Sequence, residues 1–266
     1  MTVLERCVSA LVLVIAAFAV VFMLTPLVVT VIVSFGSASV FTLPPPEWSF
    51  RWYERLASLR GFAPALATSV QIAALSTAIA LVMGTMCAIA LARGKVRGSE
   101  AIISFLVSPL MLPGLVIGIA LLQFFREIGL RDAWVSLLLA HVVITLPYVA
   151  RTVIGALSLF DFTLIDAART LGHSYPAAIR KVLVPVLGPA FMTSGMFAFL
   201  ASMDNYPISI FFSDAWTKTL PIQMLQYVEE RPDPTIAAIS TCLILLATLA
   251  MIIGDRLVGI RRMAQF

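Results

Sequence analysis

An acid and a tyrosine follow the end of a long apolar run, and they are the clearest candidates in this chain for binding a solute. Asp204 comes directly after the apolar stretch 182–203, and Asn205 and Tyr206 follow it. Ionisable groups at membrane depth cost free energy, so they mark functional positions. A carboxylate attracts an ammonium group, and the face of a tyrosine ring attracts a cation. The pattern predicts a solute path at these three residues; an acid that only caps a turn at the water interface is the alternative.

A second polar segment, 159–181, separates two apolar runs and is too charged to lie in lipid. Its charged residues are Asp161, Asp166, Arg169, Arg180 and Lys181. Asp161 and Ser174 are residue types that cap helix starts, and Gly172 suits a helix end. The segment therefore predicts a helix, a turn and a second helix outside the bilayer.

One side of the first helix in this segment is apolar. Leu164, Ile165, Ala168 and Leu171 recur at helical spacing, and the small residues Ala167, Ala168 and Gly172 permit close approach by another protein. A structured, exposed segment of this kind predicts a docking surface. The alternative is a loop that only folds back on the helix bundle.

The composition of the chain predicts that membrane-spanning helices position both segments. The chain has 266 residues, of which 61% are hydrophobic and only 12% charged, whereas soluble domains are about 25% charged. Its apolar runs are close to the roughly 20 residues that span a bilayer as helix. Because backbone groups in lipid must be satisfied internally, these unbroken runs predict an all-α, polytopic membrane protein.

The pattern predicts six transmembrane helices in a single membrane domain covering 1–266, with no internal repeat. The expected spans are 8–33, 68–92, 101–124, 133–150, 182–203 and 235–254. Pro109, Pro113 and Gly114 interrupt the third span, and Gly114 and Gly118 have the spacing of a close helix contact. Segments 34–67 and 204–234 are expected outside the cell, and an amphipathic stretch occupies 50–59.

Lysine and arginine in the loops predict the orientation. With a cytoplasmic N-terminus, 11 of these cations fall inside and 7 outside, and the strongest contributor is the cluster Arg93, Lys95 and Arg97. Arg261 and Arg262 also fall inside. Both termini and the segment 159–181 are therefore expected in the cytoplasm, and Asp204 is expected at the outer surface.

The sequence lacks the residues that several function classes require. The sequence has no Gly-x-x-x-x-Gly-Lys-Ser/Thr loop, so any ATP must be hydrolysed by a partner. Cys7, Cys87 and Cys242 have no metal or disulfide spacing, and His141 is expected to be a hydrogen-bonded core residue. We expect no catalytic residue, metal, cofactor or nucleic-acid partner. A stand-alone secondary transporter would show paired ionisable groups near mid-membrane. A membrane enzyme would show a cluster of His, Asp or Glu. The sequence shows neither pattern, so both alternatives are disfavoured.

The polar segment resembles the EAA motif of ABC importer permeases. Asp166-Ala167-Ala168, Gly172 and the later Val184-Pro185 match Glu-Ala-Ala-x-x-x-Gly followed by Ile-x-Leu-Pro. Asp replaces Glu, and Val replaces Leu. The resemblance implies a type I importer-like fold and a coupling helix in which Asp166, Ala167, Ala168, Leu171 and Gly172 dock into an ATP-binding subunit. It also implies an ATP-binding subunit dimer, a second homologous permease and an extracytoplasmic solute-binding protein as partners.

The resemblance is strongest to the second permease of spermidine/putrescine-type importers. It rests on Leu200-Ala201-Ser202-Met203-Asp204, on Thr219-Leu220-Pro221-Ile222 and on the stretch from Asp233 to Ala238. Asn205 stands where that branch often has a second acid. The resemblance implies a subunit of the bacterial cytoplasmic (inner) membrane that carries a polyamine-like solute; Fe(III), aminoethylphosphonate or another small solute is the alternative.

Overall fold

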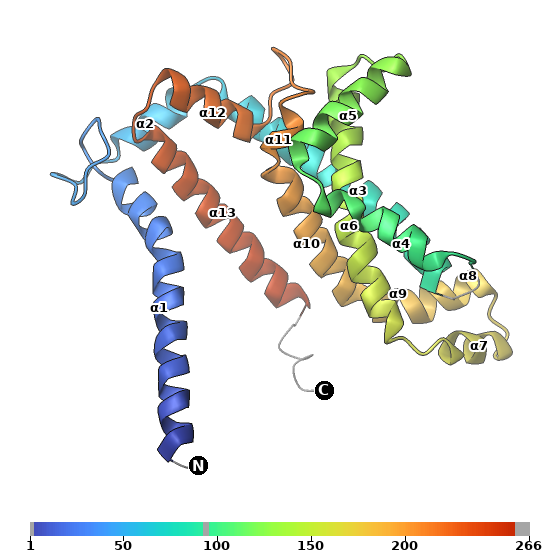
Figure 1. Cartoon of the computed structure of the whole chain (residues 1–266). Helices are drawn as coiled ribbons and strands as arrows, with labels where there is room; N and C mark the ends of the chain where they lie inside the picture. Colours follow the sequence, from blue (N-terminus) through green and yellow to red (C-terminus); the bar gives the residue numbers. More distant parts are fainter. Residues whose placement is uncertain (1–2, 93–95, 259–266) are drawn as a thin grey trace. The chain divides into compact units, whose positions relative to one another are not determined.

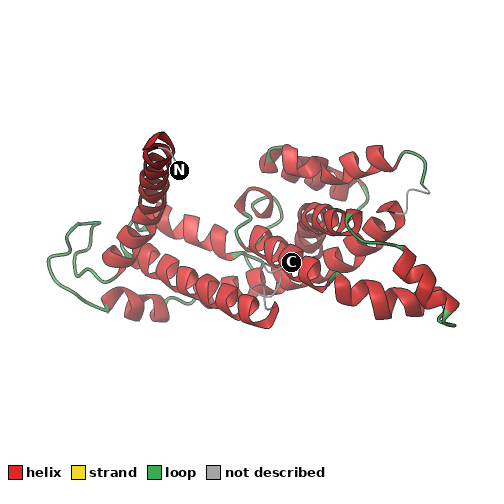
Figure 2. Ribbon diagram, turned by 90° about the horizontal axis from the view of Figure 1, so that it is seen from below, coloured by secondary structure: helices red, strands yellow, loops and turns green. Residues whose placement is uncertain are grey.

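The protein is all-helical in the part of the chain that the structure describes, which confirms the predicted fold class. The computed structural model describes residues 3–92 and 96–258, and their only β interaction is an isolated bridge between Gly36 and Trp48 (Figure 2). Arg93, Lys95, Arg261 and Arg262, which contributed to the predicted orientation, lie outside the described residues. The chain forms two compact units, Met1–Arg60 with Met224–Ile253 and Gly61–Gln223 with Gly254–Phe266. The single membrane domain stays a prediction.

Three helices within the described residues are each long and apolar enough to cross a membrane. They are α1 (Val3–Ser34), α3 (Phe62–Ala92) and α6 (Ala133–Ser158). Two bent helix pairs also qualify when each is counted as one span. In α13 (Thr235–Val258), the apolar stretch Thr235–Leu249 is shorter. These elements follow the predicted order of spans, and the count of six stays a prediction.

Both bent pairs are broken where the sequence places proline. The first joins α4 (Ser99–Val107) and η1 (Ser108–Met111) to α5 (Gly114–Glu127) with a bend of 110°. The second bends by 69° and contains α8 (Tyr175–Ala178), the π-helical turn η2 (Ile179–Leu183), α9 (Val184–Val186) and α10 (Gly188–Met203). Proline cannot donate a backbone hydrogen bond and clashes with the preceding turn, so it opens the helix at these points. The predicted interruption of the third span is confirmed.

Two predicted boundaries were wrong. The fourth span does not end at residue 150, because α6 continues through the buried Pro147 to Ser158. Neighbouring helices can satisfy the backbone groups that a proline frees, so a membrane helix tolerates it. The second span starts earlier than expected, at Phe62 rather than at residue 68.

In the first unit, α2 (Arg51–Ser58) is anchored by a buried tryptophan, and the predicted amphipathic stretch is confirmed as a helix. Trp52 is 1% exposed, and its Nε1–H donates to the Gly36 carbonyl oxygen at 2.8 Å. Arg55 of the same helix forms an ion pair of 3.3 Å with Asp233. Asp233 also accepts a hydrogen bond from the Tyr227 hydroxyl at 3.1 Å. This unit also contains α1, whose apolar side chains from Val8 to Val28 are exposed, as expected for a helix that faces lipid.

The second unit packs α3, α6 and α10 against one another. The small buried residues Ala73, Ala80, Gly84 and Ala88 form one face of α3, and such faces let membrane helices approach closely. Figure 1 shows α6 running from the end of α5 at one end of this unit to α7 (Thr163–Thr170) at the other, with α10 returning beside it to α11 (Tyr206–Ser209). The two candidate segments therefore lie at opposite ends of this unit.

We expect Gly84→Ala to lower the free energy of unfolding by about 1–3 kcal/mol, the usual cost of overpacking. A Cβ at Gly84 would lie 2.9 Å from Val149 Cγ1 and 3.3 Å from the backbone nitrogen of Ala150 on α6. Gly155→Ala is the matched control, since a Cβ there meets nothing within 4 Å; helix propensity predicts a neutral or slightly stabilising effect. Thermal unfolding in detergent measures both, and equal midpoints would contradict this account of α3–α6 packing.

Candidate functional site

The polar segment 159–181 folds as the predicted helix, turn and helix. The Asp161 carboxylate accepts the Thr163 backbone N–H at 2.9 Å, and this hydrogen bond holds the pKa of Asp161 below its usual value. Asp161 precedes the N-cap residue, Phe162, by one position. Gly172 has φ +91°, a left-handed conformation that favours glycine, so the predicted helix end is confirmed. Ser174 occupies the N-cap position of α8, but the prediction that its side chain caps was wrong, since it forms no cap hydrogen bond.

The helix α7 has one side buried in its own unit and one side exposed. Ile165 and Ala168 are 1% and 7% exposed and belong to a core cluster with Ala178, Leu183 and Val153. This packing fixes α7 against the elements that precede and follow it, which gives the opposite side a defined orientation.

The exposed side of α7 is apolar along its middle. Leu164 is 49% and Leu171 82% exposed, and Ala167 is exposed between them. We call Leu164, Ala167 and Leu171 the exposed α7 face. Asp166 lies beside it, with its carboxylate 3.9 Å from the Arg169 guanidinium. Exposed apolar side chains at helical spacing are typical of an interaction surface.

The structure thus separates the residues that the sequence grouped together. Asp166, Ala167, Leu171 and Gly172 are exposed, whereas Ala168 is buried and positions the helix. Leu164, which the sequence placed on the apolar side but not among the docking residues, is exposed beside Ala167. Periodicity alone could not identify it, because Leu164 and Ile165 share one apolar stripe.

At the other end of the second unit, α10 stops at Met203 and the chain turns through Asp204 and Asn205 into α11. Asp204 is exposed. The Asn205 side chain caps α11 by accepting the Ile208 N–H at 3.0 Å. Tyr206 is half-buried at the start of α11. The three residues of the predicted solute path are therefore adjacent at a helix break.

A hollow of about 170 Å³ lies beside this break. Asn205 and Tyr148 contribute its polar side chains, and Pro109, Leu112 and Gly114 line it from the broken third span. Asp204 and Tyr206 are not among its lining residues. The structure therefore joins Asn205 to the interruption at Pro109–Gly114, a connection that the sequence did not predict because these residues are far apart in the chain.

A buried histidine holds both sides of the helix break. His141 on α6 is 1% exposed, and its Nδ1 and Nε2 lie 2.7 Å and 2.9 Å from the hydroxyl oxygens of Ser202 and Ser209. Ser209 donates to the Asn205 carbonyl oxygen, so it must accept a proton from Nε2–H. Nδ1 then accepts from Ser202, which in turn accepts from Ser76 on α3 at 3.3 Å. The expectation of a hydrogen-bonded core histidine is confirmed.

The chain is similar in sequence to membrane components of known transport systems. The family described as "Binding-protein-dependent transport system inner membrane component" matches residues 80–261. The Haemophilus influenzae spermidine/putrescine transport system permease protein PotC is 33% identical over 233 residues, which cover 88% of this chain and 90% of the relative. The Escherichia coli K12 putrescine transport system permease protein PotI is 30% identical and covers 84% and 82%.

A solved structure supports the fold. A bacterial ABC transporter involved in the import of the acidic polysaccharide alginate matches with a TM-score of 0.71, over 97% of this chain and 98% of the matched chain, at 16% identity. The sequence and the fold together define a membrane subunit of an ABC importer. The chain belongs to the binding-protein-dependent transport system inner membrane component family. It is a transport subunit and not an enzyme, and its family implies an ATP-binding subunit, a second permease and a binding protein as partners.

Proposed function

We propose that the protein is one permease of a polyamine importer in the bacterial cytoplasmic membrane and forms half of its translocation pathway. The observation that carries the proposal is the placement of two features at opposite ends of one helical unit. The exposed α7 face lies at one end, and the break at Asp204–Tyr206 lies at the other. A subunit that couples ATP hydrolysis inside to solute entry outside needs both.

The exposed α7 face is the proposed docking surface for the ATP-hydrolysing subunit. In the predicted orientation it lies in the cytoplasm, where Leu164, Ala167 and Leu171 would enter an apolar groove. Asp166 and Gly172 border this face, and Ala168 and Ile165 connect it to α8, η2 and α6. Movement of the ATPase subunits would therefore be transmitted to α10, which follows η2 and α9 in the chain and ends at Asp204.

The solute is proposed to be a polyamine such as spermidine or putrescine, the solutes named for the two relatives. Asp204 is exposed at the outer end of α10 in the predicted orientation, so its carboxylate can attract an ammonium group that leaves the binding protein. Asn205 and Tyr148 line the adjacent hollow and offer neutral hydrogen-bonding groups to the same solute. Asn205 in place of a second acid leaves one carboxylate at the break, which suits a single ammonium group at a time.

We expect Asp204→Asn to raise the KM for uptake of labelled spermidine by about tenfold, the effect of removing one favourable interaction of about 1.4 kcal/mol. The measurement uses proteoliposomes that contain the assembled importer, with binding protein and ATP supplied. Glu127→Gln is the matched control, since Glu127 is an exposed acid at the end of α5 in the same unit. Equal KM values for Asp204→Asn and the parent would contradict the solute role of Asp204. Uptake of an anionic solute such as aminoethylphosphonate in place of spermidine would contradict the polyamine assignment.

A further inference from the structure

A loop of the first unit, residues 36–48, connects α1 to α2 and exposes apolar side chains. We call it the α1–α2 loop. Large apolar side chains within it and directly after it are between 54% and 70% exposed: Val40, Phe41, Leu43, Trp48 and Phe50. Single exposed apolar residues are common, but a group of them on one projecting loop indicates a surface that something outside the chain covers.

The base of the α1–α2 loop is fixed by hydrogen bonds, so its tip has a defined position. The Ser37 backbone N–H donates to the Glu47 carbonyl oxygen at 3.0 Å. The Arg51 guanidinium donates to the Ser37 carbonyl oxygen at 2.7 Å, and its Cζ lies 4.4 Å from the centre of the Trp52 ring. Trp52 is buried and anchors α2. The loop is therefore a built projection of the first unit.

The position of the loop brings it to the surface of the bilayer. The helix α1 is long and apolar enough to cross a membrane and ends at Ser34, so the loop begins two residues beyond the expected bilayer surface. Figures 1 and 2 show the loop extending sideways from the end of α1 rather than along the helix axis. Tryptophan is enriched at this depth because its ring is apolar and its N–H is polar. Trp48 therefore has the residue type and the location of an interfacial anchor.

The backbone of the loop also suits apolar surroundings. Pro44, Pro45 and Pro46 follow the exposed side chains of Val40 to Leu43, and proline has no backbone N–H. An unsatisfied backbone donor costs free energy in lipid. Three consecutive prolines reduce the number of donors that must keep a water partner, so the loop can enter a lipid interface at a lower desolvation cost.

A cation lies behind the apolar tip. Arg51 is exposed and forms no ion pair with a carboxylate of the described residues, whereas Arg55 on the same helix is paired with Asp233 at 3.3 Å. An arginine beside an apolar surface keeps its stem on that surface and presents its charged end to the polar layer. A guanidinium matches a phosphate with two parallel hydrogen bonds. Lipid headgroups offer phosphates at this depth.

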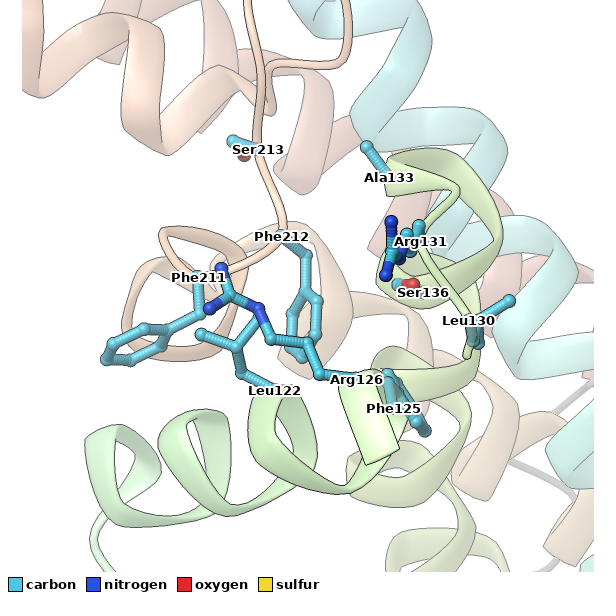
Figure 3. A pocket seen from close by; sticks show the side chains of 10 residues that line it. All are labelled: Leu122, Phe125, Arg126, Leu130, Arg131, Ala133, Ser136, Phe211, Phe212 and Ser213. Carbon is cyan, nitrogen blue, oxygen red and sulfur yellow. The ribbon is translucent and has the colours of Figure 1, made fainter. Parts of the chain in front are cut away.

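A hollow of about 530 Å³ in the second unit shows the opposite arrangement of aromatic side chains (Figure 3). Its wall residues Phe125 and Phe212 are 6% and 5% exposed, with ring centroids 5.6 Å apart. These rings are covered by their own unit. Phe41 and Trp48 are 58% and 70% exposed, so their apolar surface must be covered from outside the chain.

We propose that the α1–α2 loop is a membrane anchor that inserts Val40, Phe41 and Leu43 into the outer leaflet, with Trp48 at the interface and Arg51 bound to a phospholipid phosphate. The inference goes beyond the proposed function, since it depends on the bilayer and on the predicted orientation and not on the solute. The anchor fixes the depth of the outer end of α1 and of the start of α2.

The test measures the depth of a nitroxide spin label in the assembled importer in lipid nanodiscs, by electron paramagnetic resonance. The label is attached at Phe41→Cys or Leu43→Cys in a chain whose native cysteines are replaced by alanine. Collisions with oxygen, which concentrates in lipid, are compared with collisions with a water-soluble nickel chelate. Interfacial apolar segments lie roughly 5–10 Å into the headgroup and acyl boundary, and we expect this depth at both positions. Glu230→Cys is the matched control, since Glu230 is an exposed acid at the end of α12 in the same unit, where the label should be in water.

A second set of variants shows whether the apolar tip drives the insertion. A label at Val40→Cys should be immersed in the parent loop and lose its immersion when Phe41→Ser and Leu43→Ser are combined. Trp216→Ser is the matched control, because it removes an aromatic side chain that is 92% exposed outside the loop. The Val40 label should keep its depth in this control.

Three outcomes would overturn the proposal. The first is a label at 41 and 43 that the nickel chelate reaches as readily as it reaches the label at Glu230. The second is a label that neither oxygen nor the chelate reaches, which would assign the loop to the second permease. The third is a label that is in water until the solute-binding protein is added and is then immobilised. Uptake of spermidine reports separately on the proposed function, since a different solute would leave the depth of the label unchanged.

Discussion

A Leu171→Glu permease is expected to lose its ATP-hydrolysing subunit on purification, with at least a tenfold drop in the co-purified amount. Leu171 is 82% exposed at the end of α7, so its substitution leaves the interior of the unit untouched. Burying a leucine side chain in a partner is worth about 1.5–3 kcal/mol, and a buried unpaired carboxylate adds a desolvation cost. Since about 1.4 kcal/mol corresponds to a factor of ten in affinity, the complex should dissociate during affinity purification.

Two neighbouring alanines provide the control for this prediction. Ala167→Glu changes the exposed α7 face and should reduce ATPase binding without lowering the unfolding midpoint of the isolated permease. Ala168→Glu places the same carboxylate in a position that is 7% exposed, next to Ile165 and Ala178 in the core cluster. It should lower the midpoint itself, since a buried charge without a partner is strongly destabilising. If both single variants, Leu171→Glu and Ala167→Glu, retained the ATPase, α7 would not be the docking surface.

The sequence predicted where this segment begins and ends better than it predicted which residues face outward. Asp161 accepts a hydrogen bond from the nearby backbone, and Gly172 has a left-handed φ. Both roles depend on the residue type alone, so the sequence could predict where the segment begins and where its first helix ends. The division between Leu164 and Ile165 depends on α8 and η2, which pack against only one side of the helix. Leu164 and Ile165 therefore differ in exposure because of tertiary packing, which the local sequence pattern does not contain.

Similar limits apply to the membrane helices. Pro109 and Pro113 predicted a break that is present, but no local pattern predicted its bend angle of 110°. The fourth span was predicted to end at residue 150, but α6 continues through the buried Pro147 to Ser158. His141 was predicted to be hydrogen-bonded, whereas its partners lie 61 and 68 residues away and are defined only by the packing of α6 against α10 and α11.

The second large effect is expected at this histidine. His141→Leu should lower the free energy of unfolding by about 1–3 kcal/mol, since two interhelical hydrogen bonds to Ser202 and Ser209 are lost and each contributes about 0.6–1.7 kcal/mol in a membrane interior. Leucine has a similar volume, so a cavity contributes little. The comparison variant is Ser194→Ala, which removes a buried hydroxyl of α10 that donates only to the Phe191 carbonyl oxygen of its own helix. Thermal unfolding in detergent measures both.

A combined variant separates the hydrogen bonds from the packing at this position. Replacing His141 with Leu, and Ser202 and Ser209 with Ala, removes the imidazole together with both hydroxyls bonded to it, while Ser76 keeps the Ala73 carbonyl oxygen as an acceptor. Such a joint replacement of hydrogen-bond partners can be nearly neutral. We therefore expect the triple variant to recover most of the stability that His141→Leu loses. Equal losses in the single and triple variants would show that the imidazole acts through its shape rather than through its hydrogen bonds.

The same variants also test whether the helix break needs this support for transport. Ser202 and Ser209 lie on either side of Asp204, Asn205 and Tyr206, so the His141 hydrogen bonds fix the ends of the segment that is proposed to meet the solute. The triple variant should be stable yet show a raised KM for spermidine uptake, because α10 and α11 are no longer joined through α6. A triple variant with the parental KM would show that His141 only stabilises the unit. A raised KM at parental stability would show that His141 positions the solute path.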